Sequence, residues 1–211
     1  MGTLLDAIAA GDLDRVKEIV EAHPERAADR GPDGVSVVLR CLYSGRLELA
    51  QAVLAAHPPL DVFDASGLGD ISSLASMLAA GAPVTEYAGD GFTALHLAAF
   101  FDAPYAAALL VRAGADPEAV SDNEIRVRPL HSALAGRSVA VASMLLAVGA
   151  DPDVVQHGGF TPLMAAAQNG DAEFADLLLA CGADPRRASD DGRTAADLAL
   201  AAGHAALAEH L

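Results

Sequence analysis

Tryptophan is absent from this sequence of 211 residues, and aromatic residues make up only 4% of it. Lysine occurs once, at Lys17, and the only two cysteines, Cys41 and Cys181, are far apart in the chain. These absences argue against one large aromatic core, and they exclude a disulfide framework or a cysteine-rich metal site, since both need clustered cysteines. The 53% hydrophobic content is mainly Ala, Leu and Val, which favours thin layers of short, closely packed helices.

Positive charge is also scarce, because 13 Lys and Arg face 29 Asp and Glu, for a net charge of −16. Such a surface repels phosphate, so we expect neither nucleic acid nor a membrane as partner. No apolar run approaches the ~20 residues of a membrane-spanning helix, and the first residues lack the pattern of a signal peptide. We therefore expect a cytoplasmic protein with reduced thiols. Abundant Ala, Asp and Arg are typical of a bacterial source.

The acidic residues are unevenly distributed. No Lys or Arg occurs between Arg46 and Arg112. Seven acidic residues lie in this interval: Glu48, Asp61, Asp64, Asp70, Glu86, Asp90 and Asp102. A negative zone of this kind would attract a partner with a basic surface. Alternatively, the charge serves only to keep an Ala-rich surface soluble.

Two short motifs recur along the chain at one period. Gly-Ala-Asp, or Gly-Ala-Pro in the first case, begins at glycines that are 33, 35 and 33 residues apart, namely Gly81, Gly114, Gly149 and Gly182. A second motif advances with it, as Thr-Ala-Leu-His, Arg-Pro-Leu-His, Thr-Pro-Leu-Met and Thr-Ala-Ala-Asp, beginning at Thr93, Arg128, Thr161 and Thr194. Two independent landmarks with a common period indicate a stack of repeated units.

The clearest unit covers residues 157–190. Thr161 can cap a helix whose first residue is Pro162, and this helix should end at Gly170. A second helix should cover residues 172–180 and end at the following Gly-Ala-Asp-Pro. Neither helix is long enough to be stable alone, so the unit requires neighbours.

These motifs resemble the ankyrin repeat family, whose pattern is a turn, Thr-Pro-Leu-His, a short helix, Gly, a longer Leu-rich helix and Gly-Ala-Asp. The resemblance is clearest over residues 89–203. Overall, the sequence resembles bacterial, cytoplasmic ankyrin repeat proteins that stand alone, without a catalytic domain. It implies an all-α solenoid of stacked helix-turn-helix units with short projecting β-hairpin loops. The single domain of residues 1–211 should divide into repeats at 1–33 (N-terminal cap), 34–60, 61–87, 88–122, 123–156, 157–189 and 190–211 (C-terminal cap).

The second and third repeats depart most from this pattern. In the second repeat, Ser36 and Arg40 stand in the places that the family gives to Thr and His. The third repeat enters its first helix almost directly after Pro58 and Pro59. We therefore expect its hairpin to be truncated and to leave a notch in the row of loop tips. A deletion without functional consequence is the alternative.

The residue types needed for chemistry are present without the required spacing. The resemblance implies that His96 and His131 bond the backbone of the preceding loop, and neither has a partner at metal-ligand or catalytic spacing. The chain contains neither a Gly-x-Ser-x-Gly nucleophile motif nor a phosphate-binding loop with its lysine. We expect no enzyme, and hence no catalytic residue, metal site or cofactor.

In the family, loop tips and the exposed side of the first helices line a concave groove in which partners bind. The residues that match these positions or flank them are Asp90, Phe92, Phe100, Phe101, Tyr105, Ile125, Arg126, Arg128, Phe160, Gln168, Asn169, Asp191 and Arg193. Large exposed aromatic residues of this kind resemble binding hot spots. Alternatively, Phe100 and Phe101 only fill the space left by a missing glycine turn.

The expected function is a monomeric, non-catalytic module that binds a protein or peptide through this concave face. The alternative is a dedicated inhibitor or immunity-type protein that masks a basic partner surface. A cryptic enzyme or small-molecule sensor would need a closed apolar pocket with convergent polar groups, which the repeat spacing gives no reason to expect.

Overall fold

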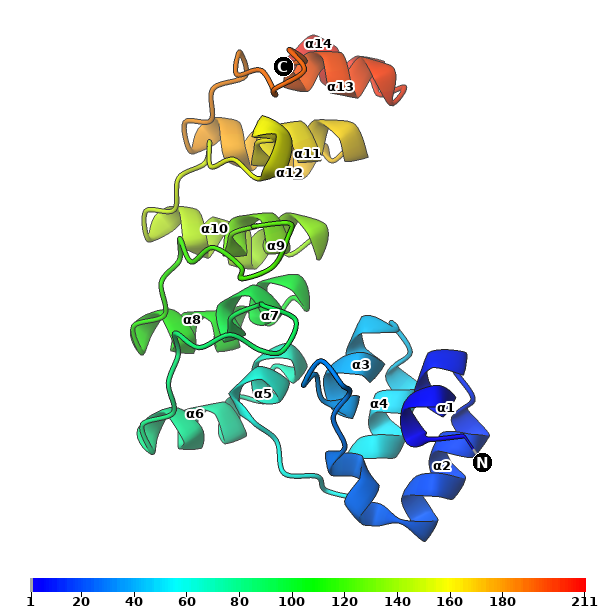
Figure 1. Cartoon of the computed structure of the whole chain (residues 1–211). Helices are drawn as coiled ribbons and strands as arrows, with labels where there is room; N and C mark the ends of the chain where they lie inside the picture. Colours follow the sequence, from blue (N-terminus) through cyan, green and yellow to red (C-terminus); the bar gives the residue numbers. More distant parts are fainter. Residues whose placement is uncertain (1) are drawn as a thin grey trace.

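The computed structural model describes residues 2–211, in which seven helix pairs are stacked (Figure 1). The pairs are α1 (Leu4–Ala10) with α2 (Leu13–Ala22), α3 (Val37–Tyr43) with α4 (Leu47–Leu54), α5 (Val62–Leu68) with α6 (Ile71–Ala79), α7 (Ala94–Phe100) with α8 (Pro104–Arg112), α9 (Pro129–Ala135) with α10 (Val139–Ala147), α11 (Pro162–Asn169) with α12 (Ala172–Ala180), and α13 (Ala195–Ala201) with α14 (Ala205–His210). Short 3₁₀ helices η1 (Pro24–Ala28) and η2 (His157–Gly159) lie in two loops. The expected all-α solenoid is confirmed.

The local chemistry of the unit at residues 157–190 is the predicted one. The Thr161 hydroxyl accepts a hydrogen bond from the Met164 N–H at 3.2 Å, and Pro162 is the first helical residue. Helix α11 ends at Gly170, whose φ of 70° is left-handed, a conformation that glycine adopts without steric cost. Helix α12 covers residues 172–180, as expected.

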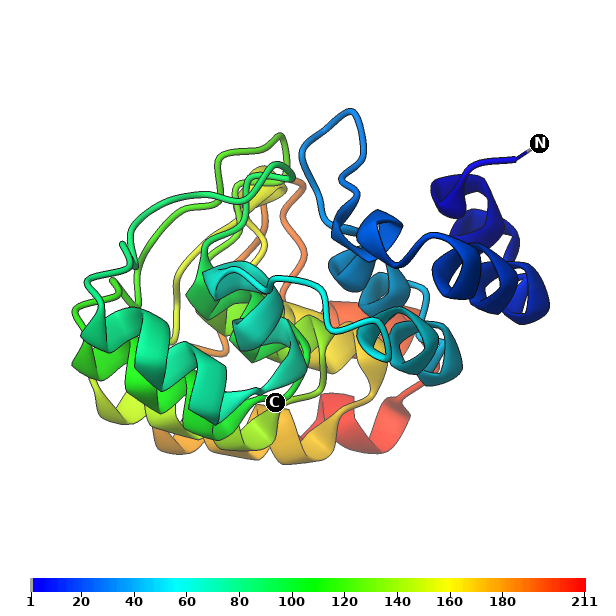
Figure 2. The ribbon, with the colours of Figure 1, turned by 90° about the horizontal axis from the view of Figure 1, so that it is seen from below.

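The first helices of the pairs form an inner layer and the second helices an outer layer, and the loops project to one side (Figure 2). Single antiparallel bridges close four of these loops into hairpins, between Arg30 and Ser36, Tyr87 and Thr93, Gln156 and Phe160, and Ala188 and Thr194. The projecting β-hairpin loops implied by the family resemblance are therefore present.

The apolar core is divided into two main clusters. One cluster joins α1–α4, and we call residues 2–59 the N-terminal arm. The other joins α5–α14, and we call residues 60–211 the C-terminal arm. A small third cluster of Val35, Leu39 and Leu97 connects the arms, with Phe63 and Phe101 among the residues packed against it, and Leu60 and Leu68 of the C-terminal arm pack against the cluster of the N-terminal arm. The two arms therefore bury most of their apolar surface separately.

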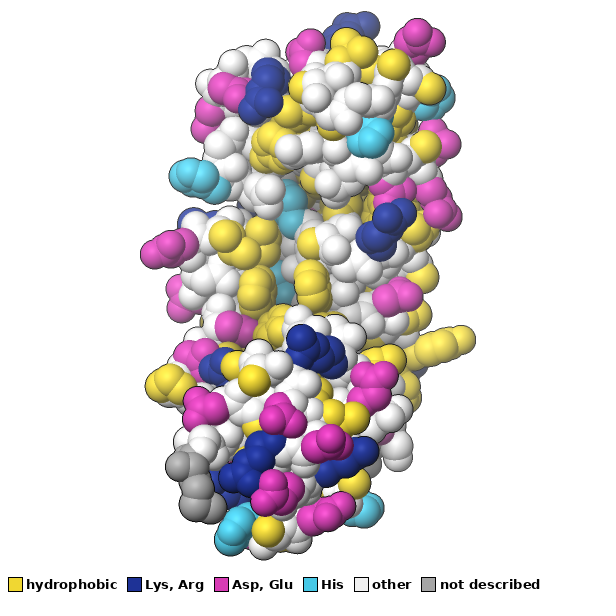
Figure 3. Space-filling view, turned by 90° about the vertical axis from the view of Figure 1, so that its right-hand side faces the viewer, with side chains coloured by type: hydrophobic (Ala, Val, Ile, Leu, Met, Phe, Trp, Pro, Cys, Tyr) yellow, Lys and Arg dark blue, Asp and Glu magenta, His cyan; other side chains and the backbone are white. Residues whose placement is uncertain are grey.

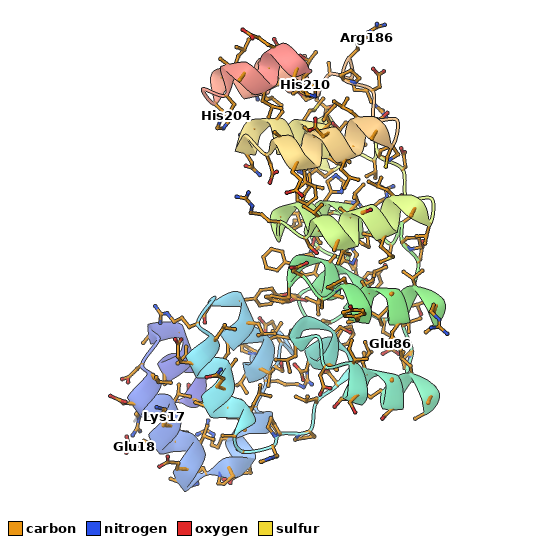
Figure 4. The ribbon with its side chains drawn as sticks, turned by 180° about the vertical axis from the view of Figure 1, so that it is seen from behind. Lys17, Glu18, Glu86, Arg186, His204 and His210 are labelled. Carbon is orange, nitrogen blue, oxygen red and sulfur yellow. The ribbon has the colours of Figure 1, made fainter. Side chains whose placement is uncertain are left out.

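The array bends where the arms meet. Along the inner layer every helix packs on the next, whereas in the outer layer α4 and α6 share only marginal contact, as do α12 and the short terminal α14. The N-terminal arm consequently lies to one side of the stack in Figure 1. Seen from behind, α6, α8, α10 and α12 lie in a row, while α2, which carries Lys17 and Glu18, belongs to a separate group (Figure 4).

The truncated hairpin of the third repeat is confirmed, because residues 55–61 connect α4 to α5 without a β-bridge. The predicted notch is wrong. The hairpins of the second and fourth repeats meet across the gap, so that a Cβ added to Gly34 would lie 3.7 Å from the Cα of Gly89. A Cβ on Gly89 would overlap the Asp33 carbonyl. Without a third hairpin between them, the neighbouring hairpins close against each other.

The prediction that Arg40 replaces the family histidine is also wrong. Ser36 caps α3 by accepting from the Leu39 N–H at 3.0 Å, so Leu39 is the third helical residue, where the histidine would be. Arg40 instead binds the Asp33 carboxylate at 2.6 Å. The spacing from cap to third helical residue is the usual one, and the prediction was off by one residue because this repeat has Val37 and Val38 in place of the Pro-Leu pair of the fifth and sixth repeats.

In the third repeat the third helical residue, where the family has histidine, is Asp64, which is buried. Its carboxylate accepts from the Ser36 hydroxyl of the preceding repeat. Burial raises the pKa of Asp64 to about 6, against the effect of the Ser36 hydrogen bond. Nearby, Asp61 pairs with Arg30 at 2.6 Å.

His96 accepts a hydrogen bond from the Thr93 N–H at 3.3 Å, at the end of the preceding loop, as the family resemblance implies. It also links the fourth repeat to the fifth, which was not predicted. Its Nδ1 lies 2.8 Å from the Thr93 hydroxyl and its Nε2 lies 3.0 Å from the Val127 carbonyl oxygen. His131 accepts from the Arg128 N–H at 3.3 Å, but its buried Nε2 faces the Phe160 carbonyl without hydrogen-bond geometry. Burial lowers the pKa of each histidine to about 4.

We expect core substitutions in different repeats to have similar costs. Leu110 and Leu178 are fully buried in the C-terminal arm, and Leu110→Ala or Leu178→Ala should each lower the free energy of unfolding by ~2–5 kcal/mol. Urea titration measures this loss. The matched control is Leu200→Ala at an exposed site, which should change stability by less than ~0.5 kcal/mol. Near-zero loss at both core sites would contradict the packing described above.

Acid should destabilise the protein through the two buried histidines. Their folded pKa values of about 4 lie below the ordinary histidine value of 6.5, so their stabilisation is complete above pH 6.5 and is lost as the pH falls toward 4. Between pH 7 and pH 5 each histidine should cost about 2 kcal/mol of unfolding free energy, measured by urea titration.

Variants separate the groups that titrate in this window. The double variant His96→Gln, His131→Gln should lose less unfolding free energy between pH 7 and pH 5 than the wild-type protein. Replacement of the exposed His210 by Gln should leave this loss unchanged. Asp64 acts in the opposite direction, because its penalty at neutral pH is relieved as the pH falls from about 6. Asp64→Asn should therefore increase the loss of unfolding free energy between pH 7 and pH 5. A flat profile in the wild-type protein would contradict the neutral, buried state of both histidines.

Candidate partner-binding groove

A cavity of about 320 Å³ lies between the loops of the fourth to sixth repeats and the inner helices α7, α9 and α11. We call it the inner groove and define it by Phe92, Phe100, Ile125, His131, Leu134, Gln156 and Asn169. Figure 3 shows this face, with a groove between two columns, hydrophobic side chains on its walls and histidine at its floor. Its lining residues include no Asp, Glu, Lys or Arg.

Two exposed apolar side chains form opposite walls of the inner groove. Phe100 is the last residue of α7 and is 38% exposed, whereas the equivalent residues of α9 and α11 are Ala135 and Gln168. Ile125, which is 52% exposed, projects from the tip of the facing loop. The wall formed by the ends of the inner helices therefore carries one aromatic residue, Phe100, beside the smaller Ala135 and Gln168.

Hydrogen bonds fix the loop that carries Ile125. The Ser121 hydroxyl accepts from the Val127 N–H at 2.9 Å, and the Asn123 side chain donates to the Asp90 carbonyl at 2.9 Å. The second bond joins this loop to the hairpin of the fourth repeat. The wall is thus preorganised, which reduces the entropy cost of binding.

His131 makes the floor of the groove neutral. Its pKa of about 4, lowered first by burial and then by Arg128, keeps the imidazole uncharged near pH 7. The inner groove consequently offers apolar contact and neutral polar groups, with no fixed charge among its lining residues.

A second cavity, of about 540 Å³, lies on the other side of the bend. It is lined by Leu5 and Ile8 of α1, Tyr43 of α3, Arg46 and Asp90. Tyr43 separates it from the inner groove. The Tyr43 ring centroid is 6.2 Å from that of Phe100 and 5.3 Å from that of Phe101.

We call Tyr43, Phe100 and Phe101 the aromatic corner. The Tyr43 hydroxyl donates to the Asp90 carboxylate at 2.7 Å. Burial and this carboxylate raise the pKa of Tyr43, so the hydroxyl stays protonated. Sequence reasoning missed Tyr43, although the signal was available, because Tyr43 ends α3 as Phe100 ends α7.

The structure brings together four of the expected partner-binding residues, since Phe92, Phe100, Ile125 and Asn169 all line the inner groove. Arg126 and Gln168 adjoin two of them in sequence, and Arg128 follows Val127, which also lines the groove. Arg126 and Gln168 are exposed, whereas half-buried Arg128 is held by Glu118 at 3.1 Å and by the Val155 carbonyl at 3.3 Å.

The other expected residues lie elsewhere. Phe101 packs into the cluster between the arms, close to Gly67, which supports the space-filling interpretation for this residue. Tyr105 is 78% exposed near the start of α8, outside the residues that line the groove. Phe160 packs against the core of the C-terminal arm. In the last hairpin Asp191 and Arg193 pair at 2.6 Å, and this pairing lowers the pKa of Asp191.

The acidic residues between Arg46 and Arg112 are mostly engaged in local contacts. Asp61 pairs with Arg30, Asp70 accepts from the Ser73 N–H at 3.1 Å, and Asp102 accepts from the Ser138 hydroxyl at 2.5 Å. Asp90 binds Tyr43. Glu86 is exposed beside the stack, on the side away from the N-terminal arm (Figure 4). These carboxylates are therefore not gathered in the groove.

Within residues 2–211, no three or more His, Cys, Asp or Glu side chains are arranged to hold a metal ion. No helix in this part of the chain is long and apolar enough to cross a membrane. Cys41 is buried and Cys181 is exposed. Burial raises the pKa of the Cys41 thiol to about 12.

Comparison with known proteins agrees with this architecture. Residues 130–211 match a family model described as ankyrin repeats in three copies, and residues 90–122 match the model of a single ankyrin repeat. Over 141 residues the chain is 33% identical to human neurogenic locus notch homolog protein 4, an alignment that covers 66% of this chain and 6% of that protein. The two family matches together cover more than half of the chain, which therefore belongs to the ankyrin repeat family.

Proposed function

We propose that this chain is a non-catalytic interaction module that binds a protein or peptide partner in the inner groove. Ankyrin repeats are generally protein–protein interaction modules. The observation that carries the proposal is the uncharged cavity of about 320 Å³ between the exposed side chains of Phe100 and Ile125. Exposed aromatic and apolar residues around a preformed depression are typical of interface hot spots.

The lining favours one large apolar side chain of the partner as anchor. Phe92, Phe100, Ile125 and Leu134 supply apolar contact, and removing such surface from water contributes roughly 25 cal/mol per Å². Gln156 and Asn169 can form hydrogen bonds with the partner backbone on either side of the anchor.

Charge has a separate role in this proposal. Because no Asp, Glu, Lys or Arg lines the groove, the net charge of −16 acts on the encounter with a basic partner more than on the bound contacts. An inhibitor that masks a basic surface would have to rely on carboxylates outside the groove.

A selection from a peptide library against the immobilised protein tests the proposal. Selected peptides should share a large apolar residue, and Ile125→Asp should weaken their binding at least tenfold, as loss of an interface hot spot does (about 2 kcal/mol). The matched control is Val148→Asp, at an exposed apolar site after α10 that does not line the groove. It should leave the dissociation constant within twofold.

Equal binding to both variants would show that the inner groove is not the binding site. Peptides rich in Lys and Arg that lack an apolar anchor would instead favour the inhibitor-type role. Circular dichroism of both variants must match the wild-type protein, since Ile125 lies in a loop and its replacement should not unfold the array.

A further inference from the structure

We propose that the third repeat is a hinge that regulates the inner groove by letting the two arms close, as described here, or open. The proposal rests on the proposed function only in naming the groove as the binding site. The motion itself is a property of the free protein and can be measured without a partner.

The arms are built as separable bodies. Each has its own apolar cluster. The contacts that join them are few: the small cluster of Val35, Leu39 and Leu97, the packing of Leu60 and Leu68 on the N-terminal arm, and the polar pairs Arg30–Asp61 and Ser36–Asp64. Most of the burial that stabilises each arm is therefore kept when the angle between them changes. Motion between rigid bodies of this kind is the expected behaviour when the interface is small.

Specific contacts close the inner side of the junction. Gly89 lies against the backbone of Asp33 and Gly34, and Tyr43 of the N-terminal arm donates to Asp90 of the C-terminal arm at 2.7 Å. These contacts join the second repeat directly to the fourth, across the third. They form a latch that exists only in the closed arrangement.

The outer side of the junction is open and offers a competing contact. Leu47 and Ile71 are the first residues of the successive outer helices α4 and α6, and they are 65% and 36% exposed. Straightening the array would bring these helices into the packing that α6 already makes with α8. Apolar burial on the outer side would then offset the loss of the latch, as in other two-state hinges.

The connection between the arms can absorb such a rotation. Residues 55–61 lack a hairpin that would brace them, and His57 already has a left-handed φ of 52°. Pro58 and Pro59 fix the φ of the middle of the segment. The change of dihedral angles therefore falls at the two ends of the connection, as at other hinges.

Opening would alter the binding face directly. Tyr43 belongs to the N-terminal arm and Phe100 to the C-terminal arm, and their ring centroids are 6.2 Å apart at the end of the inner groove. Separation of the arms would remove Tyr43 from this end. A partner that contacts both rings would stabilise the closed arrangement, because it binds that state better.

Spin-label distances between the outer helices test the hinge. Labels on Glu48→Cys in α4 and Ser72→Cys in α6 occupy equivalent exposed positions. Exposed Cys181 is replaced by Ser, while buried Cys41, with its raised pKa, should not react. Double electron–electron resonance then reports the distribution of α4–α6 distances.

Loss of the latch should populate a shorter distance. Tyr43→Phe removes the hydrogen bond to Asp90, and Gly89→Ala places a Cβ on the Asp33 carbonyl. Each should raise the fraction of the short-distance population at least threefold over the wild-type protein. The direction follows from the bend, because opening the inner side closes the outer side.

Matched controls disturb equivalent contacts inside one arm. Tyr87→Phe removes a hydrogen bond to the Val120 carbonyl, and Gly159→Ala places a Cβ against Asp190, away from the aromatic corner. Both should lower stability without changing the α4–α6 distances. If the controls shift the distances as much as the latch variants do, the change is general loosening and the hinge is wrong.

An unchanged distribution in folded Tyr43→Phe and Gly89→Ala proteins would also overturn the hinge. That result would leave the proposed function intact, provided that Ile125→Asp still weakened peptide binding at least tenfold. The opposite combination is also informative. If the latch variants shift the α4–α6 distances but the selected peptides bind Ile125→Asp as tightly as the wild-type protein, the groove is not the binding site, while the hinge motion stands.

Discussion

No inner helix of this protein can bury its apolar face alone, because each has only seven or eight residues. Helices of this length are marginal in water, so each repeat depends on contact with the next. Alanine and glycine allow this contact to be close, as where Gly136 meets the Phe100 backbone. Any repeat that is shorter than its neighbours must therefore change the geometry of the whole array, and the third repeat does so.

One position in each inner helix shows how neighbouring repeats are coupled. The third helical residue is His96 in the fourth repeat, where it bonds the loop of the fifth, and Asp64 in the third, where it bonds Ser36 of the second. In the sixth repeat it is Met164, whose sulfur lies 3.5 Å from the Thr161 nitrogen. The coupling thus runs forward at His96 and backward at Asp64, so the two directions diverge from the third and fourth repeats.

Local chemistry explains how much of the fold could be predicted. Caps such as Thr161 and helix ends such as Gly170 depend on a few adjacent residues, so the sequence alone located α11 and α12. The position of Arg40 was misjudged because its repeat lacks the Pro-Leu landmark. Four groove residues were predicted through the family pattern. Tyr43 was missed although it ends α3 as Phe100 ends α7, and only its contacts with Phe100 and Asp90 depend on the closure of the second repeat on the fourth.

The missing hairpin has a consequence for the shape of the molecule. The segment that joins α6 to α7 covers residues 80–93, whereas the segment that joins α4 to α5 covers only residues 55–61. The bend therefore lies where the connection is short, in a surface loop whose length can change at little cost. Lengthening the connection between α4 and α5 to a full hairpin would separate the second and fourth repeats and straighten the array, with every core side chain unchanged.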